Sequence, residues 1–241
     1  MRGRLLDRSR QTGEDFRFLL HRYAAERFLH RLGESAYRDR YILKGAMLFP
    51  LLGGSIYRAT GDLDFTGYGG SEPTDADRHR LWQRDRASGD RGPLPDSARH
   101  AGPTDPRIPL ESVVAEKLHA MVVLGERNSR YKDFYDLYVL ARQFAFNGER
   151  LTAAVAATFE RRQTAIGAAL PVALAPRFYA DVARAARWRA YLARNSLPGA
   201  PADWTAVGEL LRAFLEAPLR AIADGRTFFD AWPPAGPWTA P

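Results

Sequence analysis

A polar stretch from Thr66 to Arg107 divides the chain and limits where its core can be built. The stretch is rich in Gly, Pro, Asp and Arg and has very few large apolar residues, so it contributes little to a core. A structureless loop of this length is uncommon inside a compact domain. We therefore interpret the stretch as a mobile insertion or as a place where an ancestral element has been lost, and the core must come from the residues on both sides.

The segment before the polar stretch predicts a helix followed by two short strands. Phe16, Leu19, Leu20 and Tyr23 keep helical spacing within "EDFRFLLHRYAAERFLHRL", and Gly33 breaks this helix. The run "YILK" starts apolar and β-branched, as a short buried strand does, and "GAMLFP" after it predicts a glycine turn and a short helix. The segment "SIYRATGDLDFTGYGG" predicts one further strand bounded by glycines.

The segment after the polar stretch predicts a mainly helical remainder. The run "ESVVAEKLHAMVVLG" predicts a helix that stops at Gly125, and "SRYKDFYDLYVLARQF" predicts a second helix. From about Leu151 the chain is rich in Ala and Arg with aromatic anchors, which predicts further helices. The tail "AWPPAGPWTAP" predicts extended, loosely held chain, because its prolines oppose regular structure.

The charge balance and the missing cysteines narrow the class of protein. Lys and Arg number 35 against 28 Asp and Glu, for a net charge of +7. This balance favours a polyanionic partner, although arginines on solvated helix faces explain it equally well. Without cysteine, any metal must be held by oxygen or imidazole ligands. No run is long enough to cross a bilayer and the N-terminus lacks a secretory signal, which predicts a soluble cytoplasmic protein with no membrane partner.

Two aspartates lie two residues apart in "GDLDF". Alternate side chains of a strand point to the same face, so Asp62 and Asp64 are expected to stand side by side. Like charges on one face repel, and the pair therefore calls for a cation between them. A single Asp-x-Asp pattern is nevertheless a weak signal for a metal site.

Charged residues also fall on the apolar faces of the two central helices. Lys117 lies four residues from both Val113 and Met121, inside the apolar face of its helix, so it must either extend to water or find an anion. Asp133 and Asp136 lean towards the core side of the next helix. Asp133 and Asp136 also fit a plainer interpretation, a helix N-cap followed by a first-turn acid.

Several segments, in their order along the chain, carry a more specific signal: "ERFLHRL", "YILKGAML", "YRATGDLDF", "VVAEKLHAM" and "NSRYKDFYDLYVLA". Together they resemble the AbiEii/AbiGii toxin family of nucleotidyltransferases, strongly over about residues 14–65 and 111–145. The resemblance implies an α+β fold with a polymerase-β-like nucleotidyltransferase core, a small mixed sheet flanked by helices, and a helical C-terminal part. The expected domains are a core at residues 1–150, with the polar segment at about 66–107 inside it, and a helical region at 151–241.

The same resemblance implies roles for the charged residues. Asp62 and Asp64 are expected to hold one or two Mg²⁺ or Mn²⁺ ions with the triphosphate of an NTP substrate, because hard cations prefer carboxylate oxygen. Lys117 and Asp133 are the expected catalytic partners of this pair, and Asp136 is expected to orient its neighbours. Supporting nucleotide-binding candidates are Lys44, Arg58, Lys132 and Gly45, where a glycine turn lets backbone N–H groups approach phosphate.

Two departures from the family pattern concern the catalytic strands. The first motif commonly has Gly-Gly or Gly-Ser where this chain has Gly45-Ala46, a change of little consequence. Polymerase-β-like enzymes also take a third carboxylate from a later strand, which can deprotonate the acceptor hydroxyl. Asp90, Asp96 and Asp105 are available, but none lies in an apolar strand pattern, so none is assigned.

The predicted function is that of a toxin in a toxin–antitoxin or abortive-infection system. It would transfer a nucleoside monophosphate from an NTP to an acceptor, with tRNA or another RNA favoured and a protein acceptor still open. One alternative is a shortened, catalytically weak or inactive member that binds RNA or its antitoxin, and another is an ATP-dependent kinase. The resemblance further implies a cognate antitoxin encoded nearby.

Overall fold

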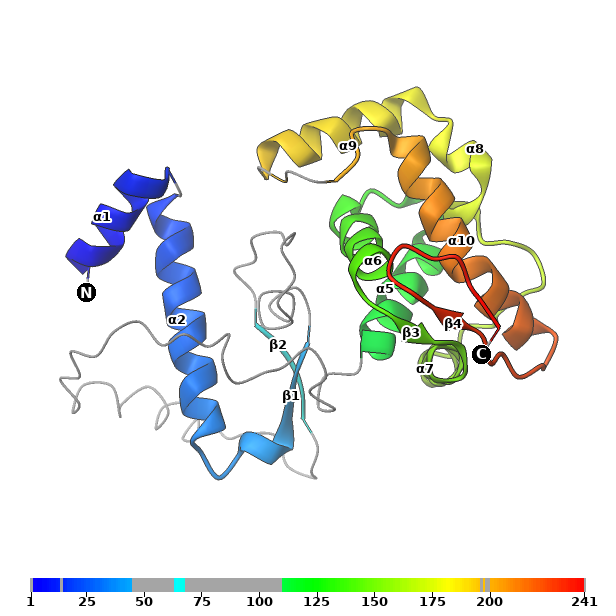
Figure 1. Cartoon of the computed structure of the whole chain (residues 1–241), viewed down its shortest axis with the longest axis horizontal. Helices are drawn as coiled ribbons and strands as arrows, with labels where there is room; N and C mark the ends of the chain where they lie inside the picture. Colours follow the sequence, from blue (N-terminus) through cyan, green and yellow to red (C-terminus); the bar gives the residue numbers. More distant parts are fainter. Residues whose placement is uncertain are drawn as a thin grey trace. The chain divides into compact units, whose positions relative to one another are not determined.

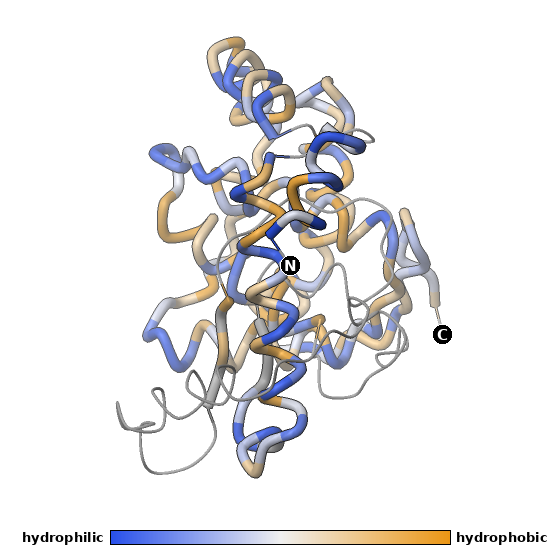
Figure 2. The backbone as a smooth tube through the Cα atoms, turned by 90° about the vertical axis from the view of Figure 1, so that its left-hand side faces the viewer, coloured by the Kyte–Doolittle hydropathy of each residue, from blue (hydrophilic) through white to orange (hydrophobic). Residues whose placement is uncertain are grey.

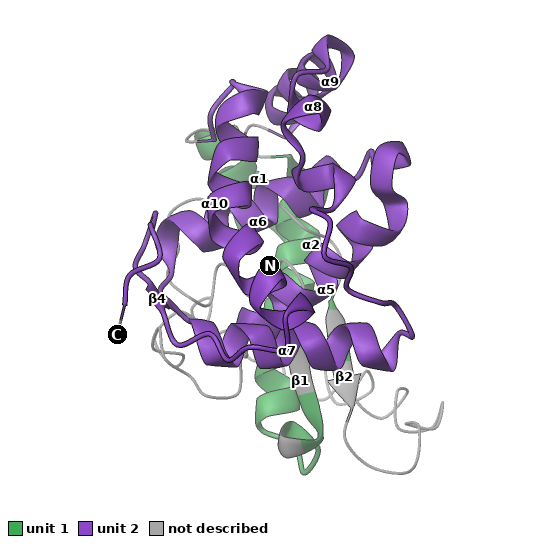
Figure 3. Cartoon of the chain, turned by 90° about the vertical axis from the view of Figure 1, so that its right-hand side faces the viewer, with its two compact units in different colours: residues 1–55, 59–108 green, residues 56–58, 109–241 purple. Residues whose placement is uncertain are grey.

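The structure is a computed structural model that describes residues 2–13, 15–44, 63–67, 110–195, 197 and 200–240. The chain divides into two units, one of residues 1–55 and 59–108 and one of residues 56–58 and 109–241 (Figure 3). The domain boundary predicted near residue 150 stays a prediction. The two units are defined by contacts between residues, and such a division does not test where a nucleotidyltransferase core would end.

The first unit begins with two helices joined at Gly13. Helix α1 spans Arg2–Thr12 and helix α2 spans Phe16–Gly33, and Gly13 adopts a φ of 73° between them, which favours glycine. The Asp15 side chain caps α2 by accepting hydrogen bonds from the backbone N–H groups of Arg17 and Phe18. Helix α2 confirms the expected helix and its end at Gly33, whereas the sequence analysis did not predict α1.

A short 3₁₀ turn, η1 (Arg38–Arg40), leads into a two-stranded antiparallel pair. Strands β1 (Tyr41–Lys44) and β2 (Asp64–Gly67) pair in a register that sets Lys44 opposite Asp64. The Phe65 ring packs edge-on against Phe28 of α2 and Tyr41 of β1, at centroid distances of 5.8 and 6.2 Å. The described strands confirm part of the expected strands, but in the described residues every strand pair is antiparallel rather than mixed. The short helix expected after Gly45 lies outside the described residues, as does nearly all of the polar stretch.

The second unit is a helical assembly (Figure 1). Helix α5 is followed by the 3₁₀ turn η4, in which Gly125 has a φ of 48°, so the expected helix stop at this glycine is confirmed. The described elements, in chain order, are α5 (Leu110–Leu124), η4 (Gly125–Arg127), α6 (Tyr131–Gln143), β3 (Phe146–Asn147), α7 (Gly148–Arg161), η5 (Val172–Leu174), α8 (Pro176–Tyr179), α9 (Val182–Arg194), α10 (Trp204–Ala223) and β4 (Ala231–Trp232). Hydrophobic and hydrophilic stretches alternate along these helices, as expected for helices with one buried face (Figure 2).

Helix α6 lies at the centre of an aromatic core. Phe134 is fully buried, and its ring packs against Trp204 of α10 at 5.0 Å and stacks on Phe178 of α8 at 5.7 Å. Trp188 of α9 is also fully buried and lies 5.2 Å from Trp204. Because three helices hold α6 through large rings, its first turn has a well-defined position for the charged residues described below.

The C-terminal tail is ordered, so the expectation of loosely held chain is wrong. Strand β4 pairs antiparallel with β3, which sets Trp232 opposite Phe146. The Trp232 ring is 1% exposed and its Nε1 donates a hydrogen bond of 2.8 Å to the Ala141 carbonyl. Trp238 donates a further bond of 2.9 Å to the Phe214 carbonyl. The tail is ordered despite its prolines because each tryptophan buries apolar surface and donates a hydrogen bond from its N–H group.

We expect Gly208→Ala to lower the free energy of unfolding by about 1–3 kcal/mol, because it overpacks the contact between α10 and α8. A Cβ atom at this position would lie 2.3 Å from the Tyr179 ring. The ring is buried, and its hydroxyl donates to the Ala173 carbonyl, so it has little room to move. Urea denaturation gives the measurement. Gly167→Ala, where a Cβ atom meets nothing within 4 Å, serves as control and should change stability by less than about 1 kcal/mol.

We expect His119 to make the stability of this unit sensitive to pH. Its Nε2 lies 2.9 Å from the Thr164 hydroxyl, which itself donates to the Arg162 carbonyl, so the ring is the donor. Burial, with a smaller contribution from Arg162, lowers the pKa of His119 below 6.5. The unfolded chain therefore binds the proton first as pH falls through about 6.5, and stability should decrease there. Thermal melts between pH 7.5 and 5 should show this loss, and His119→Gln should reduce it; an unchanged slope in the variant would contradict the assignment.

Candidate functional site: a buried lysine between two aspartates

The Lys117 side chain lies in the core-facing side of α5, between the buried residues Val114, Leu118 and Met121. Only 11% of this side chain is exposed to solvent. The sequence left two possibilities for this lysine, extension to water or an anionic partner, and the structure shows the second, because its Nζ reaches two carboxylates of α6. It lies 3.2 Å from Asp133 Oδ1 and 2.6 Å from Asp136 Oδ2.

The two aspartates lie on the core side of α6, as the spacing predicted. Asp133 is the third residue of the helix and its side chain is 4% exposed, while the Asp136 side chain, one turn later, is fully buried. The helix N-terminus carries partial positive charge, which favours an acid at Asp133. The N-cap interpretation is wrong in one respect, because the N-cap is Arg130 and neither aspartate side chain caps the helix.

Arg130 completes the cluster, and the sequence analysis did not identify it. Its Nε lies 2.7 Å from Asp133 Oδ2, although this oxygen accepts no hydrogen bond of regular geometry, so the contact is an ion pair. The spacing of three residues between Arg130 and Asp133 on one helix was the available signal. Lys117, Asp133 and Asp136 are largely buried and pair with one another, which offsets the cost of burying their charges, and the half-exposed Arg130 adds a second cation at the edge of the cluster.

The Lys117 ammonium retains one donor for an external group. An ammonium has three N–H donors, and Asp133 and Asp136 accept two of them. The third has no acceptor among the described residues, and the side chain is partly exposed. Two buried carboxylates therefore hold Lys117 in one orientation and leave it able to donate to an anion such as a phosphate oxygen.

The other predicted site residues are not part of this cluster. Lys132 is exposed on the outer side of α6. In the first unit, Lys44 and Asp64 are register partners of β1 and β2. Asp62, Gly45 and Arg58 lie outside the described residues.

The cluster itself does not fit a metal site. Within the described ranges no group of three or more His, Asp or Glu side chains could hold a metal ion. Both acids of α6 are already bonded to Lys117, whose ammonium occupies the position where a cation would bind. Asp62 and Asp64 have the hard oxygen donors that suit Mg²⁺ or Mn²⁺. The metal prediction therefore rests on Asp62 and Asp64 and not on the α6 acids.

A comparison with known protein families identifies the family to which this chain belongs. The sequence model described as nucleotidyl transferase AbiEii toxin, type IV toxin–antitoxin system, matches residues 27–100 and 90–216. These ranges hold well over half of the chain and include both Asp62 with Asp64 and the Lys117 cluster. The chain belongs to the AbiEii family. No curated protein and no solved structure matches it.

Membership of the AbiEii family confirms the resemblance drawn from the sequence motifs. It makes the chain a type IV toxin with a nucleotidyltransferase-like domain, which implies a nucleotide substrate and an antitoxin partner. Enzymes of this class generally use an NTP and a divalent metal ion. The described residues, helical with antiparallel strand pairs, agree with the α+β class. In the described part of the chain, no helix has the length and apolar composition of a membrane span.

Proposed function

We propose that the chain transfers a nucleoside monophosphate from an NTP to an RNA acceptor, in particular tRNA. Asp62 and Asp64 would hold the divalent metal, which, when bound, activates the acceptor hydroxyl and stabilises the leaving pyrophosphate. Lys44, Gly45, Arg58 and Lys132 are the candidates for binding the nucleotide. The polymerase-β-like core also belongs to this proposal, as does cytoplasmic action beside an antitoxin encoded nearby.

Lys117 would act on the NTP through its remaining N–H donor. Asp133 and Asp136 would hold the ammonium in place. Binding of the negatively charged triphosphate would then cost little further side-chain entropy. The ammonium is a compact cation, which suits phosphate as a point charge. Asp136, which is fully buried, would act by positioning Lys117 rather than by touching the substrate.

One observation carries this proposal: a lysine on a core-facing helix side is held by two buried acids and keeps a donor free. A lysine needed only for packing would be replaced at lower cost by an apolar residue of similar volume. The presence of these three charged groups in a chain that belongs to a nucleotidyl transferase toxin family supports a role in handling phosphate.

The test is a transfer assay with purified protein, each α-labelled NTP in turn, Mg²⁺ and total tRNA. We expect label on tRNA with the wild type and none with Asp62→Ala/Asp64→Ala. We also expect the double variant Lys117→Met/Asp136→Leu, which removes the lysine together with one of its partner acids, to lose transfer while keeping the fold. Circular dichroism of each variant checks that the fold is retained.

The other outcomes of the assay separate the remaining hypotheses. Equal retention of tRNA by the wild type and the double variant, without transfer, would support an inactive binding protein. Transfer of label from γ-labelled ATP instead would indicate a kinase. Label on protein rather than RNA would indicate a protein acceptor.

A further inference from the structure

Helix α9 carries arginines but no acidic side chain. Its Trp188 is fully buried and donates a hydrogen bond of 2.8 Å to the Pro201 carbonyl, which anchors one side of the helix in the core. Arg187 and Arg194 are both exposed. They are seven residues apart, close to two helical turns, so they lie on the same face of α9. This face presents positive charge to solvent.

Arg184, on the same helix, has a structural role that explains its burial. Its guanidinium donates to the Asn128 carbonyl at 3.0 Å and to the Glu126 carbonyl. It also lies 3.4 Å from Asp181 Oδ2 and 3.9 Å from the centre of the Phe178 ring. Arg184 thereby joins α9 to η4, and its own charge is compensated.

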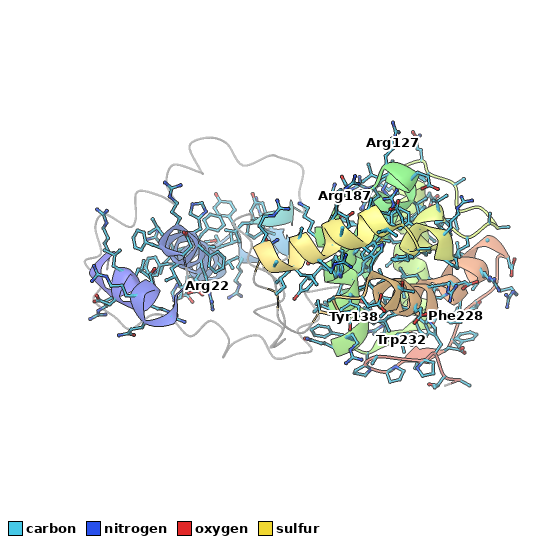
Figure 4. The ribbon with its side chains drawn as sticks, turned by 90° about the horizontal axis from the view of Figure 1, so that it is seen from above. Arg22, Arg127, Tyr138, Arg187, Phe228 and Trp232 are labelled. Atoms are coloured by element: carbon cyan, nitrogen blue, oxygen red, sulfur yellow. The ribbon has the colours of Figure 1, made fainter. Side chains whose placement is uncertain are left out.

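This junction brings Arg127 of η4 close to α9. Burial raises the pKa of the Tyr131 hydroxyl at the start of α6, and the positive charge of Arg187, one turn after Arg184, opposes this rise. Figure 4 shows Arg127 and Arg187 on the same side of the second unit, away from Phe228 and Trp232. Among the described residues, Arg127, Arg187 and Arg194 have no acidic partner within ion-pair distance, whereas Arg184 and Arg130 do.

Arg127 connects the exposed arginines to the Lys117 cluster along the chain. Arg130 lies three residues after Arg127 and pairs with Asp133, which in turn accepts from Lys117. We propose that Arg127, Arg187 and Arg194 form a phosphate-binding surface for the RNA acceptor, leading towards this cluster. The inference rests on the proposed function and names the surface that the acceptor would use.

The spacing of the three arginines favours a polynucleotide over a single nucleotide. Arg187 and Arg194 are separated by about 10 Å along the helix, at about 1.5 Å per residue, which exceeds the size of one phosphate group. Phosphates repeat along a nucleic-acid strand, and exposed arginines bind them bidentately without reading sequence. Arg187 and Arg194 therefore suit two different phosphates of one RNA strand.

The test measures tRNA binding in the Asp62→Ala/Asp64→Ala background, without NTP, as a function of salt. Adding Arg127→Gln, Arg187→Gln and Arg194→Gln should weaken binding at least about tenfold and reduce the salt slope by about two, since each phosphate contact contributes about 0.7. A matched triple, Arg142→Gln, Arg150→Gln and Arg162→Gln, removes three exposed charges elsewhere in the unit, one of them at the opposite end of α6.

Binding should be unchanged, or weakened by less than about twofold, in this control triple. Equal losses in both triples would overturn the proposal, since they would reflect net charge alone. Unchanged binding in the surface triple, or tighter binding of duplex DNA than of tRNA, would also overturn it. Because neither NTP nor the Asp62 and Asp64 side chains take part, this result and the transfer assay can fail independently.

Discussion

Asp136→Ala is expected to lower the free energy of unfolding by about 3–5 kcal/mol, because it removes a buried partner of Lys117. The Asp136 side chain is fully buried and its Oδ2 lies 2.6 Å from Lys117 Nζ, the shorter of the two lysine contacts. Without it, Asp133 alone must compensate Lys117 while also pairing with Arg130. One positive charge would then be left largely uncompensated in the core. Urea denaturation of the wild type and the variant measures the difference.

The double variant Lys117→Met/Asp136→Leu separates this cost from the function of the cluster. It replaces both members of the pair with apolar side chains of similar volume, and Asp133 keeps Arg130 as a partner. We expect it to be at least about 2 kcal/mol more stable than Asp136→Ala, since it leaves no unpaired ammonium. It should nevertheless lose nucleotidyl transfer. A cost below about 1 kcal/mol for Asp136→Ala would show that the pair is not buried as described.

Trp232→Ala is expected to cost about 3–5 kcal/mol, because the ring holds the C-terminal tail against the helical unit. The ring is 1% exposed, and its centre lies 5.0 Å from that of Phe214. Its Nε1 donates to the Ala141 carbonyl, near the end of the same helix whose first turn carries Asp133. Loss of the ring should therefore leave a cavity and release β4 from β3. Thermal unfolding and hydrogen exchange of the Gly148 amide, which bonds to the Asp230 carbonyl, report the two effects.

Phe229→Ala is the matched control for the tail. Phe229 lies three residues before Trp232 and is 58% exposed, so its removal should change stability by less than about 0.5 kcal/mol. If Trp232→Ala were as mild as Phe229→Ala, the tail would be held by its backbone bonds alone. Trp232→Phe keeps most of the packing and should lose only about 1 kcal/mol for the hydrogen bond.

Local pattern was sufficient to predict the helices that carry the site. The apolar spacing around Lys117 indicated a helix with a cation on its core side, and α5 has this arrangement. Gly125, with its positive φ, ended that helix as expected. Helical periodicity and glycine conformation depend on near neighbours in the chain, which is why a single sequence was enough.

The ordered C-terminal tail and the role of Arg130 could not be predicted from the sequence. Prolines near the C-terminus suggested loose chain, yet Trp232 bonds to Ala141, 91 residues earlier. No local pattern contains a contact of that sequence separation. Arg130 was missed for a different reason, because a helical spacing of three residues is common and only the burial of Asp133 gives it significance.

The motifs of the chain determined its membership of the AbiEii family and its helical segments, and the position of Lys117 required that its ammonium either reach water or pair with an anion. The tertiary structure alone decided that Asp133 and Asp136 both pair with this lysine, and that its third N–H donor has no acceptor among the described residues. The reason is physical: burial makes an unpaired charge costly, and burial arises only when α5 and α6 pack together.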